Sequence, residues 1–220
     1  HRGTLTTVLT TATLDAAGVG LVMPILPTLL ARIGTADAAV PLHVGLLTAL
    51  YAVMQFICAP LLGRLSDRYG RRPVLLISLA GATIDYLVLA LASSLWILYP
   101  ARAIAGITGA TNAVTATVIT DITPTHERAK RYGWLGACYG GGMIAGPAIG
   151  GFFGALSPHL PFLIAAILTT VNLLLSLTLL QETRPQPGDE TQNFTPAAST
   201  LTAIPGMALL LTAFGLVQFI

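Results

Sequence analysis

Six long apolar stretches constrain this chain more than any other feature of its sequence. Each is about twenty residues or longer, the length that an α-helix needs to cross the hydrocarbon core of a bilayer. Runs such as 74–79 lack the alternation of apolar and polar residues that a membrane β-strand needs. The sequence therefore predicts an all-α membrane protein. Its expected spans are residues 4–32, 42–63, 73–94, 96–120, 131–155 and 160–181.

The composition is typical of a membrane protein. Hydrophobic residues make up 54% of the chain and charged residues 9%, too few to cover a soluble domain. The net charge of +2 is small, so we expect no nucleic-acid partner. The four histidines are scattered, and neither a metal-ligand cluster nor a nucleophile beside a base is visible. We therefore expect no resident metal and no enzyme activity.

The segment 63–72 predicts the orientation of the spans. It carries four arginines in a short connection, and the positive-inside rule places such a connection in the cytoplasm. A second cationic connection, 127–131, follows the fourth span, whereas the connections at 93–94 and 157–159 lack Lys and Arg. The N-terminus and the segment after the sixth span are then both cytoplasmic.

Three regions follow from the distribution of apolar residues. Residues 1–181 form the N-terminal domain of six transmembrane helices, and 182–205 form a polar, Pro- and Thr-rich cytoplasmic linker. Residues 206–220 begin a seventh span that is too short to cross a membrane. The chain therefore has the organisation of the first half of a longer protein.

An internal repeat relates the first three spans to the next three. The pattern small-Pro-x-x-Gly occurs at 59–63 and again at 146–150, an offset of 87 residues. The same offset carries Asp15 onto Arg102. Because the two sets of spans run in opposite directions, this predicts the inverted three-helix repeats found in transporters.

Two carboxylates are expected near the middle of the membrane. Asp15 and Asp85 each lie about twelve residues into a helix that begins inside, roughly 17 Å deep. A charge there costs about 3 kcal/mol or more, which favours a functional site over a structural pairing, although the pairing stays open. Arg102 enters from the outer side and is the expected partner of one of these acids, which could then exchange a proton as its surroundings change.

Other polar residues have two interpretations each. Gln55, close to Tyr51 and Met54, could bind a planar amphipathic molecule, whereas Asn112 and Asn172 could equally make hydrogen bonds between helices.

Two further patterns could be structural or functional. Gly142, Gly146, Gly150 and Gly154 recur every four residues and predict a smooth helix face, on which Pro147 permits a bend. This face could serve packing alone or also seal a cavity. Asp67 and Arg71 could anchor the topology, or could form ion pairs with the other half of the protein as the inner side closes.

These motifs resemble those of a known family. Segment 63–72 is similar to the signature loop between helices 2 and 3 of the major facilitator superfamily, and 142–151 is similar to its helix 5 antiporter motif. The resemblance to TetA-type tetracycline efflux proteins runs from about residue 5 to 183, and the segments that carry it are 14–24, 49–55, 81–86 and 106–111.

The resemblance implies a fold, a function and a location. The fold is the six-helix N-terminal bundle of a twelve-helix protein, completed by a missing C-terminal six-helix half. The function is efflux of tetracycline as a magnesium chelate in exchange for protons, which confers resistance. Mg²⁺ enters with the drug, no cofactor is required, and the location is the bacterial inner membrane. A broader multidrug antiporter and a non-transporting receptor or scaffold domain remain the alternatives.

The resemblance and the residue patterns together give four sets of candidate residues. The proton-coupling set is Asp15, Asp85 and Arg102. The substrate-binding set is Asp15, Tyr51, Gln55, Asp85 and Asn112, where Asn112 replaces the glycine usual in the family. The cytoplasmic gate set is Gly63, Asp67, Gly70 and Arg71. The antiporter-motif set is Gly142, Gly146, Pro147, Gly150 and Gly151.

Overall fold

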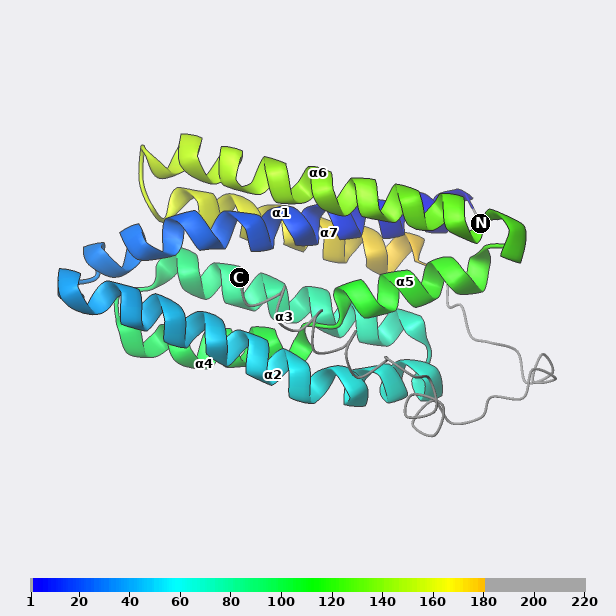
Figure 1. Cartoon of the computed structure of the whole chain (residues 1–220), viewed down its shortest axis with the longest axis horizontal. Helices are drawn as coiled ribbons and strands as arrows, with labels where there is room; N and C mark the ends of the chain where they lie inside the picture. The colour runs from blue at the N-terminus through cyan, green and yellow to red at the C-terminus, as the bar shows by residue number, and fades with distance from the viewer. Residues whose placement is uncertain (1, 181–220) are drawn as a thin grey trace, which may run out of the picture. The chain divides into compact units, whose positions relative to one another are not determined.

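The computed structural model describes residues 2–180, and every secondary-structure element among them is helical (Figure 1). These elements are α1 (Arg2–Arg32), η1 (Asp37–Ala39), α2 (Val40–Tyr69), α3 (Arg71–Leu91), α4 (Leu95–Thr108), α5 (Thr111–Ile122), η2 (Thr125–Glu127), α6 (Arg128–Gly154) and α7 (Leu160–Leu179). The all-helical fold is confirmed. The predicted linker at 182–205 and the start of a seventh helix at 206–220 lie outside the described residues.

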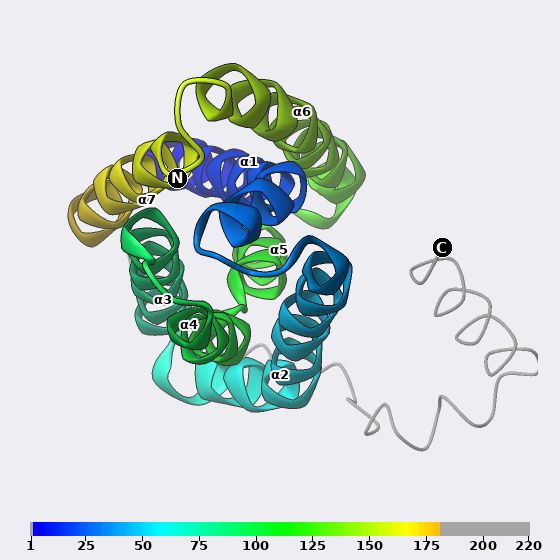
Figure 2. The ribbon, with the colours of Figure 1, turned by 90° about the vertical axis from the view of Figure 1, so that its left-hand side faces the viewer.

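The helices form a bundle with α1 and α3 at its centre. Helix α1 packs between α6 and α7, while α3 packs against α7 on one side and α4 on the other (Figure 2). Helix α2 lies along α4, and α5 contacts α1 and α3. This arrangement brings residues of five helices, α1 to α5, toward one interior region.

Five helical stretches in the described part of the chain are long and apolar enough to cross a membrane. They are Gly3–Arg32, Asp37–Tyr69, Arg71–Leu91, Leu95–Ile122 and Leu160–Leu179. Helix α6, the fifth predicted span, is 27 residues long and could also reach across.

The fourth span is broken, and the prediction of one continuous helix over 96–120 was wrong. Helix α4 ends at Thr108 and α5 begins at Thr111. Between them Gly109 has φ −71° and ψ 63°, the geometry of an inverse γ-turn. The turn is closed by the Ala110 N–H, which donates to the Thr108 carbonyl at 2.8 Å.

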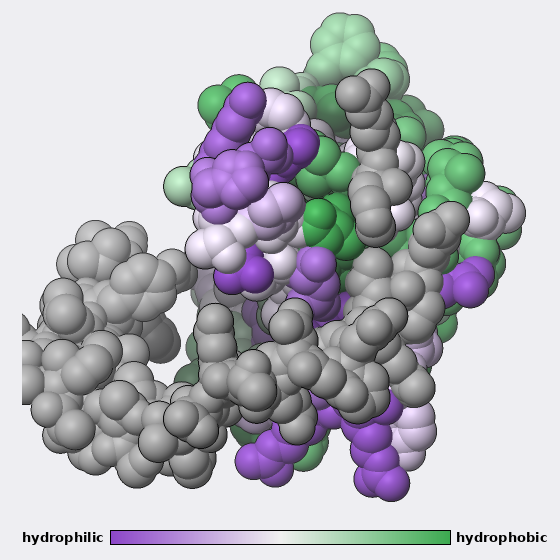
Figure 3. Space-filling model, turned by 90° about the vertical axis from the view of Figure 1, so that its right-hand side faces the viewer, coloured by the Kyte–Doolittle hydropathy of each residue, from purple (hydrophilic) through white to green (hydrophobic). Residues whose placement is uncertain are grey.

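The arginine-rich connection is mostly helical. Helix α2 continues to Tyr69, beyond the predicted end at residue 63, and α3 begins at Arg71. Only Gly70 separates the two helices, and its φ of +104° is a conformation that glycine adopts readily. The charged side chains of this turn therefore sit on helix ends. Figure 3 shows hydrophilic side chains gathered at this end of the bundle.

Two apolar clusters fill the bundle, one toward each end. One contains Leu21 and Leu98, and the other contains Val8 and Ala110. Along α1, Asp15 lies between Val8 and Leu21, and along the broken fourth span Arg102 lies between Leu98 and Ala110. Asp15 and Arg102 thus lie at the boundary between the two apolar clusters. A charge there raises the free energy of the folded protein unless it is paired or reaches a polar cavity.

The glycine face of α6 packs against α1, as the four-residue spacing predicted. A Cβ atom on Gly142 would overlap the Thr13 carbonyl, and one on Gly146 would overlap the Ala17 carbonyl. Gly150 and Gly154 face Ile25 of α1. Gly151 differs, because a Cβ there would meet no atom within 4 Å. The packing role of the face is confirmed, whereas its part in sealing a cavity stays a prediction.

Gly146→Val is expected to lower the thermal unfolding temperature of the full-length protein markedly. A branched side chain at this position would force α1 and α6 apart, and overpacking of this kind costs about 1–3 kcal/mol. Thermal unfolding in detergent, followed by intrinsic fluorescence, measures the effect. The matched control is Gly151→Val, which adds the same side chain on the open face of the same helix. Equal losses in the two variants would contradict a role for the α1–α6 contact.

Candidate functional site

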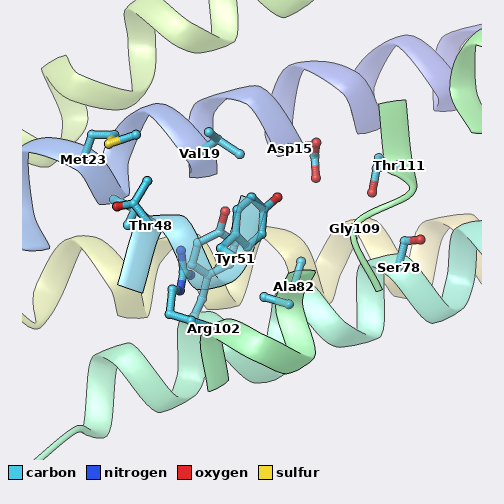
Figure 4. Close-up of a pocket in the computed structure, with 13 residues that line it drawn as sticks. Asp15, Val19, Met23, Thr48, Tyr51, Ser78, Ala82, Arg102, Gly109 and Thr111 are labelled. Atoms are coloured by element: carbon cyan, nitrogen blue, oxygen red, sulfur yellow. The ribbon is translucent and has the colours of Figure 1, made fainter. Parts of the chain in front are cut away.

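One pocket opens among α1, α2, α3, α4 and α5, at the boundary between the two apolar clusters (Figure 4). Its volume is about 80 Å³. The residues that line it are Asp15, Val19, Val22, Met23, Thr48, Tyr51, Ser78, Ala82, Tyr86, Arg102, Ala105, Gly109 and Thr111. The structure therefore brings together three of the predicted residues, Asp15, Tyr51 and Arg102.

Asp15 lies where the broken fourth span restarts. Its carboxyl group faces the side chain of Thr111, the first residue of α5 (Figure 4). The N-terminus of a helix carries partial positive charge, which favours a carboxylate placed beside it. The break in the span thus creates a polar environment for Asp15 inside the bundle.

Arg102 pairs with Asp85, which confirms the prediction that it pairs with one of the two membrane acids. The Arg102 Nε donates to Asp85 Oδ1 at 3.0 Å, and its second contact is an ion pair between Nη2 and Oδ2. The two residues are buried, with exposed fractions of 7% and 2%. The guanidinium also lies 5.5 Å from the centre of the Tyr51 ring, a cation–π distance.

Asp85 itself does not line this pocket, and its direct contact with a substrate stays a prediction. Arg102 reaches the pocket wall while its charge is neutralised by Asp85 behind it. The net charge presented to the pocket by these three groups is therefore that of Asp15. A sequence pattern could not show this, because Asp15 and Asp85 lie at similar depths in similar helices.

Gln55 and Asn112 are also absent from the pocket wall. The Gln55 Nε2 donates to the Gly109 carbonyl at 2.9 Å, and the Asn112 Nδ2 donates to Tyr139 Oη at 3.0 Å. Asn172 accepts a hydrogen bond from Thr11 Oγ1 at 3.1 Å. For all three amides the structure shows hydrogen bonds between helices, the second of the two interpretations that their sequence positions allowed.

Sequence reasoning missed four polar residues of the pocket: Thr48, Ser78, Tyr86 and Thr111. A signal existed for two of them, because Ser78, Ala82 and Tyr86 recur every four residues and so share one face of α3. Thr48 lies one helical turn before Tyr51. Thr111 carried no such signal, since its position depends on the break in the fourth span.

A second charged cluster lies at the turn between α2 and α3. The buried Arg71 guanidinium forms an ion pair with Asp67, and its Nε donates to Asp121 Oδ2 at 3.1 Å. The Arg71 Nη1 also donates to Ser66 Oγ at 3.3 Å. Gly63 precedes the cluster within α2, and Gly70 is the turn itself.

This cluster gives Arg71 partners within the described half of the protein. Its side chain is 8% exposed, whereas the Asp67 side chain is 68% exposed. Asp121 was not among the predicted residues, although an acid at the same predicted membrane edge as the arginines was a usable signal. The gate function of the cluster stays a prediction.

The architecture of the described helices is typical of one class of protein. Membrane-length helices that enclose a buried ion pair and a carboxylate beside a broken helix form the kind of site that membrane transporters use. The chain belongs to the Major Facilitator Superfamily, whose family model matches residues 8–220. It is therefore part of a multi-pass membrane transporter and not of an enzyme.

Curated relatives include several tetracycline resistance proteins. The class C protein of Escherichia coli is 52% identical over 98% of this chain and 55% of its own length. The class B protein of Escherichia coli is 57% identical over 78% of this chain and 42% of its own length. The quinolone resistance protein NorA of Staphylococcus aureus is 30% identical over 92% of this chain and 53% of its own length. The chain thus spans about half the length of the relatives it matches.

Solved structures share the fold. The human organic anion transporter MFSD10 superposes with a TM-score of 0.71 at 27% identity, covering 84% of this chain and 48% of its own. The match again involves about half of the solved chain, in agreement with the prediction that these helices are one half of a superfamily transporter.

Proposed function

We propose that the full-length protein exports tetracycline, as its magnesium chelate, in exchange for protons. The observation that carries this proposal is the charge of the pocket. Asp15 lines it, and among residues 2–180 the only other charged side chain on its wall, Arg102, is neutralised by Asp85. An ionised Asp15 would attract a positively charged chelate, and a protonated one would not. The 52% identity to a class C tetracycline resistance protein supports the choice of drug.

The size of the pocket supports a site shared between two halves. Its volume of about 80 Å³ is well below the roughly 300 Å³ or more of ordinary drug sites. A drug-sized ligand therefore needs additional surface, which the second half of the transporter would provide. Alternating access by rocking of the two halves would then expose the shared site to each side of the membrane in turn.

The orientation belongs to the same proposal. The charged cluster at the α2–α3 turn and the cations at the start of α6 lie in the two connections that the positive-inside rule assigns to the cytoplasm. On this proposal the N-terminus and the segment after α7 are in the cytoplasm of a bacterium, and the helices are in its inner membrane.

Transport into inverted membrane vesicles tests the proposed function. Vesicles that contain the full-length protein are expected to take up tetracycline when acidified inside, to stop when a proton uncoupler is added, and to require Mg²⁺. Vesicles from cells with an empty vector are the control. Uptake that survives chelation of Mg²⁺, or equal uptake of unrelated cationic drugs, would favour the multidrug alternative, and absence of any transport would favour the receptor or scaffold.

Asp67→Asn is expected to slow tetracycline uptake by an order of magnitude while leaving equilibrium binding within about twofold. The residue lies at the α2–α3 turn, away from the pocket, and Arg71 keeps Asp121 as a partner in the variant. Binding and uptake are measured on the same preparation. A parallel loss of both would show that Asp67 supports the fold or the site and does not act as a gate.

A further inference from the structure

The break between α4 and α5 leaves a backbone carbonyl that the helix cannot satisfy. At Gly109 the chain turns through the inverse γ-turn, and the next hydrogen bond of the helical ladder, from the Val114 N–H, goes to the Ala110 carbonyl. Within a membrane such a carbonyl needs a donor from a neighbouring side chain or from water in a cavity.

Gln55 of α2 is the donor that meets this carbonyl. Its Nε2 lies 2.9 Å from the Gly109 oxygen and would lie 3.0 Å from a Cβ atom on Gly109. The two helices are held at this height by a close contact, since a Cβ on Gly106 would lie 2.7 Å from Met54 Cβ. The Gln55 Nε2 also donates to Tyr51 Oη at 3.5 Å, so both hydrogens of the amide have acceptors inside the bundle.

The other side of the same break meets Asp15. Helix α5 starts at Thr111, two residues after Gly109, and the Thr111 side chain faces the Asp15 carboxyl group across the pocket (Figure 4). Two side chains thus contact the same break from opposite sides. Gln55 donates to the Gly109 carbonyl after the end of α4, and Asp15 faces the start of α5. Any shift at Gly109 moves the group that Asp15 contacts.

We propose that Gln55 is a positioning residue: through the Gly109 carbonyl it fixes the break in the fourth span, and thereby the start of α5 against Asp15. It does not contact the drug in this arrangement. The part of the proposal that concerns drug binding rests on the proposed function, whereas the part that concerns the break does not.

Hydrogen exchange tests the break without any drug. In the full-length protein, Gln55→Leu is expected to speed amide exchange in peptides covering residues 104–114 by about fivefold or more, because loss of one hydrogen bond worth about 1 kcal/mol lets the turn open more often. The matched control is Thr48→Val on the same helix, whose hydroxyl donates to the Val44 carbonyl of its own helix at 2.8 Å. Unchanged exchange in the Gln55→Leu protein would overturn the proposal.

Gln55→Glu distinguishes a positioning role from direct drug contact, because the two roles predict opposite changes of drug affinity with pH. A protonated glutamate can donate to the Gly109 carbonyl, and an ionised one cannot. The affinity of the variant for magnesium–tetracycline, divided by that of the wild type at the same pH, is expected to rise as pH falls from about 8 to about 6. A direct ligand would behave in the opposite way, because an ionised glutamate would attract the cationic chelate more strongly as pH rises.

Dividing the affinity of the variant by that of the wild type at each pH removes the effect of other groups that titrate in both proteins. Those that face this region are Asp15 of α1, Tyr51 of α2, Asp85 and Tyr86 of α3, Arg102 of α4 and Tyr139 of α6. A ratio that rises with pH, or that does not change, would overturn the positioning role in binding. If the wild type fails to bind magnesium–tetracycline at all, the proposed function is wrong, and the exchange experiment still decides whether Gln55 holds the break.

Discussion

Asp85→Asn is expected to abolish tetracycline uptake by the full-length protein, with a rate at least about a hundredfold below wild type. The substitution keeps the shape of the side chain but leaves the buried Arg102 guanidinium without its counter-charge. Removing one partner of a buried ion pair costs about 3–5 kcal/mol, far more than an exposed pair would. It also places an unneutralised positive charge on the wall of the pocket, where it would repel a cationic chelate. Initial rates of uptake into inverted vesicles measure the loss.

A double variant distinguishes the charge imbalance from the chemistry of the carboxylate. Asp85→Asn combined with Arg102→Gln removes both charges and is expected to recover the amount of folded protein in the membrane, because no buried charge is left unpaired. If Asp85 or Arg102 takes part in proton coupling, uptake stays abolished in this neutral pair. Wild-type rates in the single variant would remove Asp85 from the mechanism, and wild-type rates in the double variant would reduce the pair to a structural role.

Asp15→Asn is expected to weaken binding of magnesium–tetracycline by about thirtyfold or more. In the proposed site the Asp15 carboxylate provides the net charge of the pocket wall, and loss of one partner of a charge–charge contact typically costs about 2–5 kcal/mol. At about 1.4 kcal/mol per tenfold change in affinity, the lower bound gives roughly thirtyfold. Asparagine has the same shape as aspartate and can face Thr111 in the same way, so the fold around α5 is expected to persist.

The pH dependence of binding gives the same residue a second test. Protonation removes the negative charge of Asp15, so wild-type affinity is expected to fall as pH falls, and the Asp15→Asn protein is expected to lose most of that dependence. Because Asp15 lies close to the Arg102–Asp85 pair, the curve reports an apparent value for the coupled groups and not for one residue. Equilibrium fluorescence titration at fixed free Mg²⁺ is the measurement. A variant that keeps wild-type affinity and its full pH dependence would contradict the role of Asp15, and the dependence that remains in the variant belongs to the drug.

The positions of the helices were predictable because they depend on local properties of the chain. In a membrane the backbone must satisfy its own hydrogen bonds, so each apolar stretch of sufficient length becomes a helix whatever its neighbours are. The glycine face of α6 was predictable for a related reason, since a four-residue spacing places side chains on one face of a helix without reference to any partner. These features made the fold and the family resemblance accessible from the sequence.

The break in the fourth span was not predictable in this way. Gly109 has an ordinary φ of −71°, so no conformational demand for glycine marks the position. The break depends on how closely α2 approaches α4 at Gly106, and on the amide of Gln55, which lies 54 residues earlier in the sequence. Glycines elsewhere in the chain, such as Gly146, lie inside continuous helices.

The order of residues was enough to show which side chains carry charge into the membrane and at about what depth, because the distance along a helix is proportional to the number of residues. Which of these charges meet depends on how the helices pack. Asp15 and Asp85 were equivalent candidates for the pocket, but packing pairs Asp85 with Arg102 and leaves Asp15 on the pocket wall. The same holds for Arg71, whose partner Asp121 lies 50 residues away on another helix. The physical reason is that ion pairs between helices depend on the rotation and separation of whole helices, which are set by the sum of all their contacts and not by any local pattern.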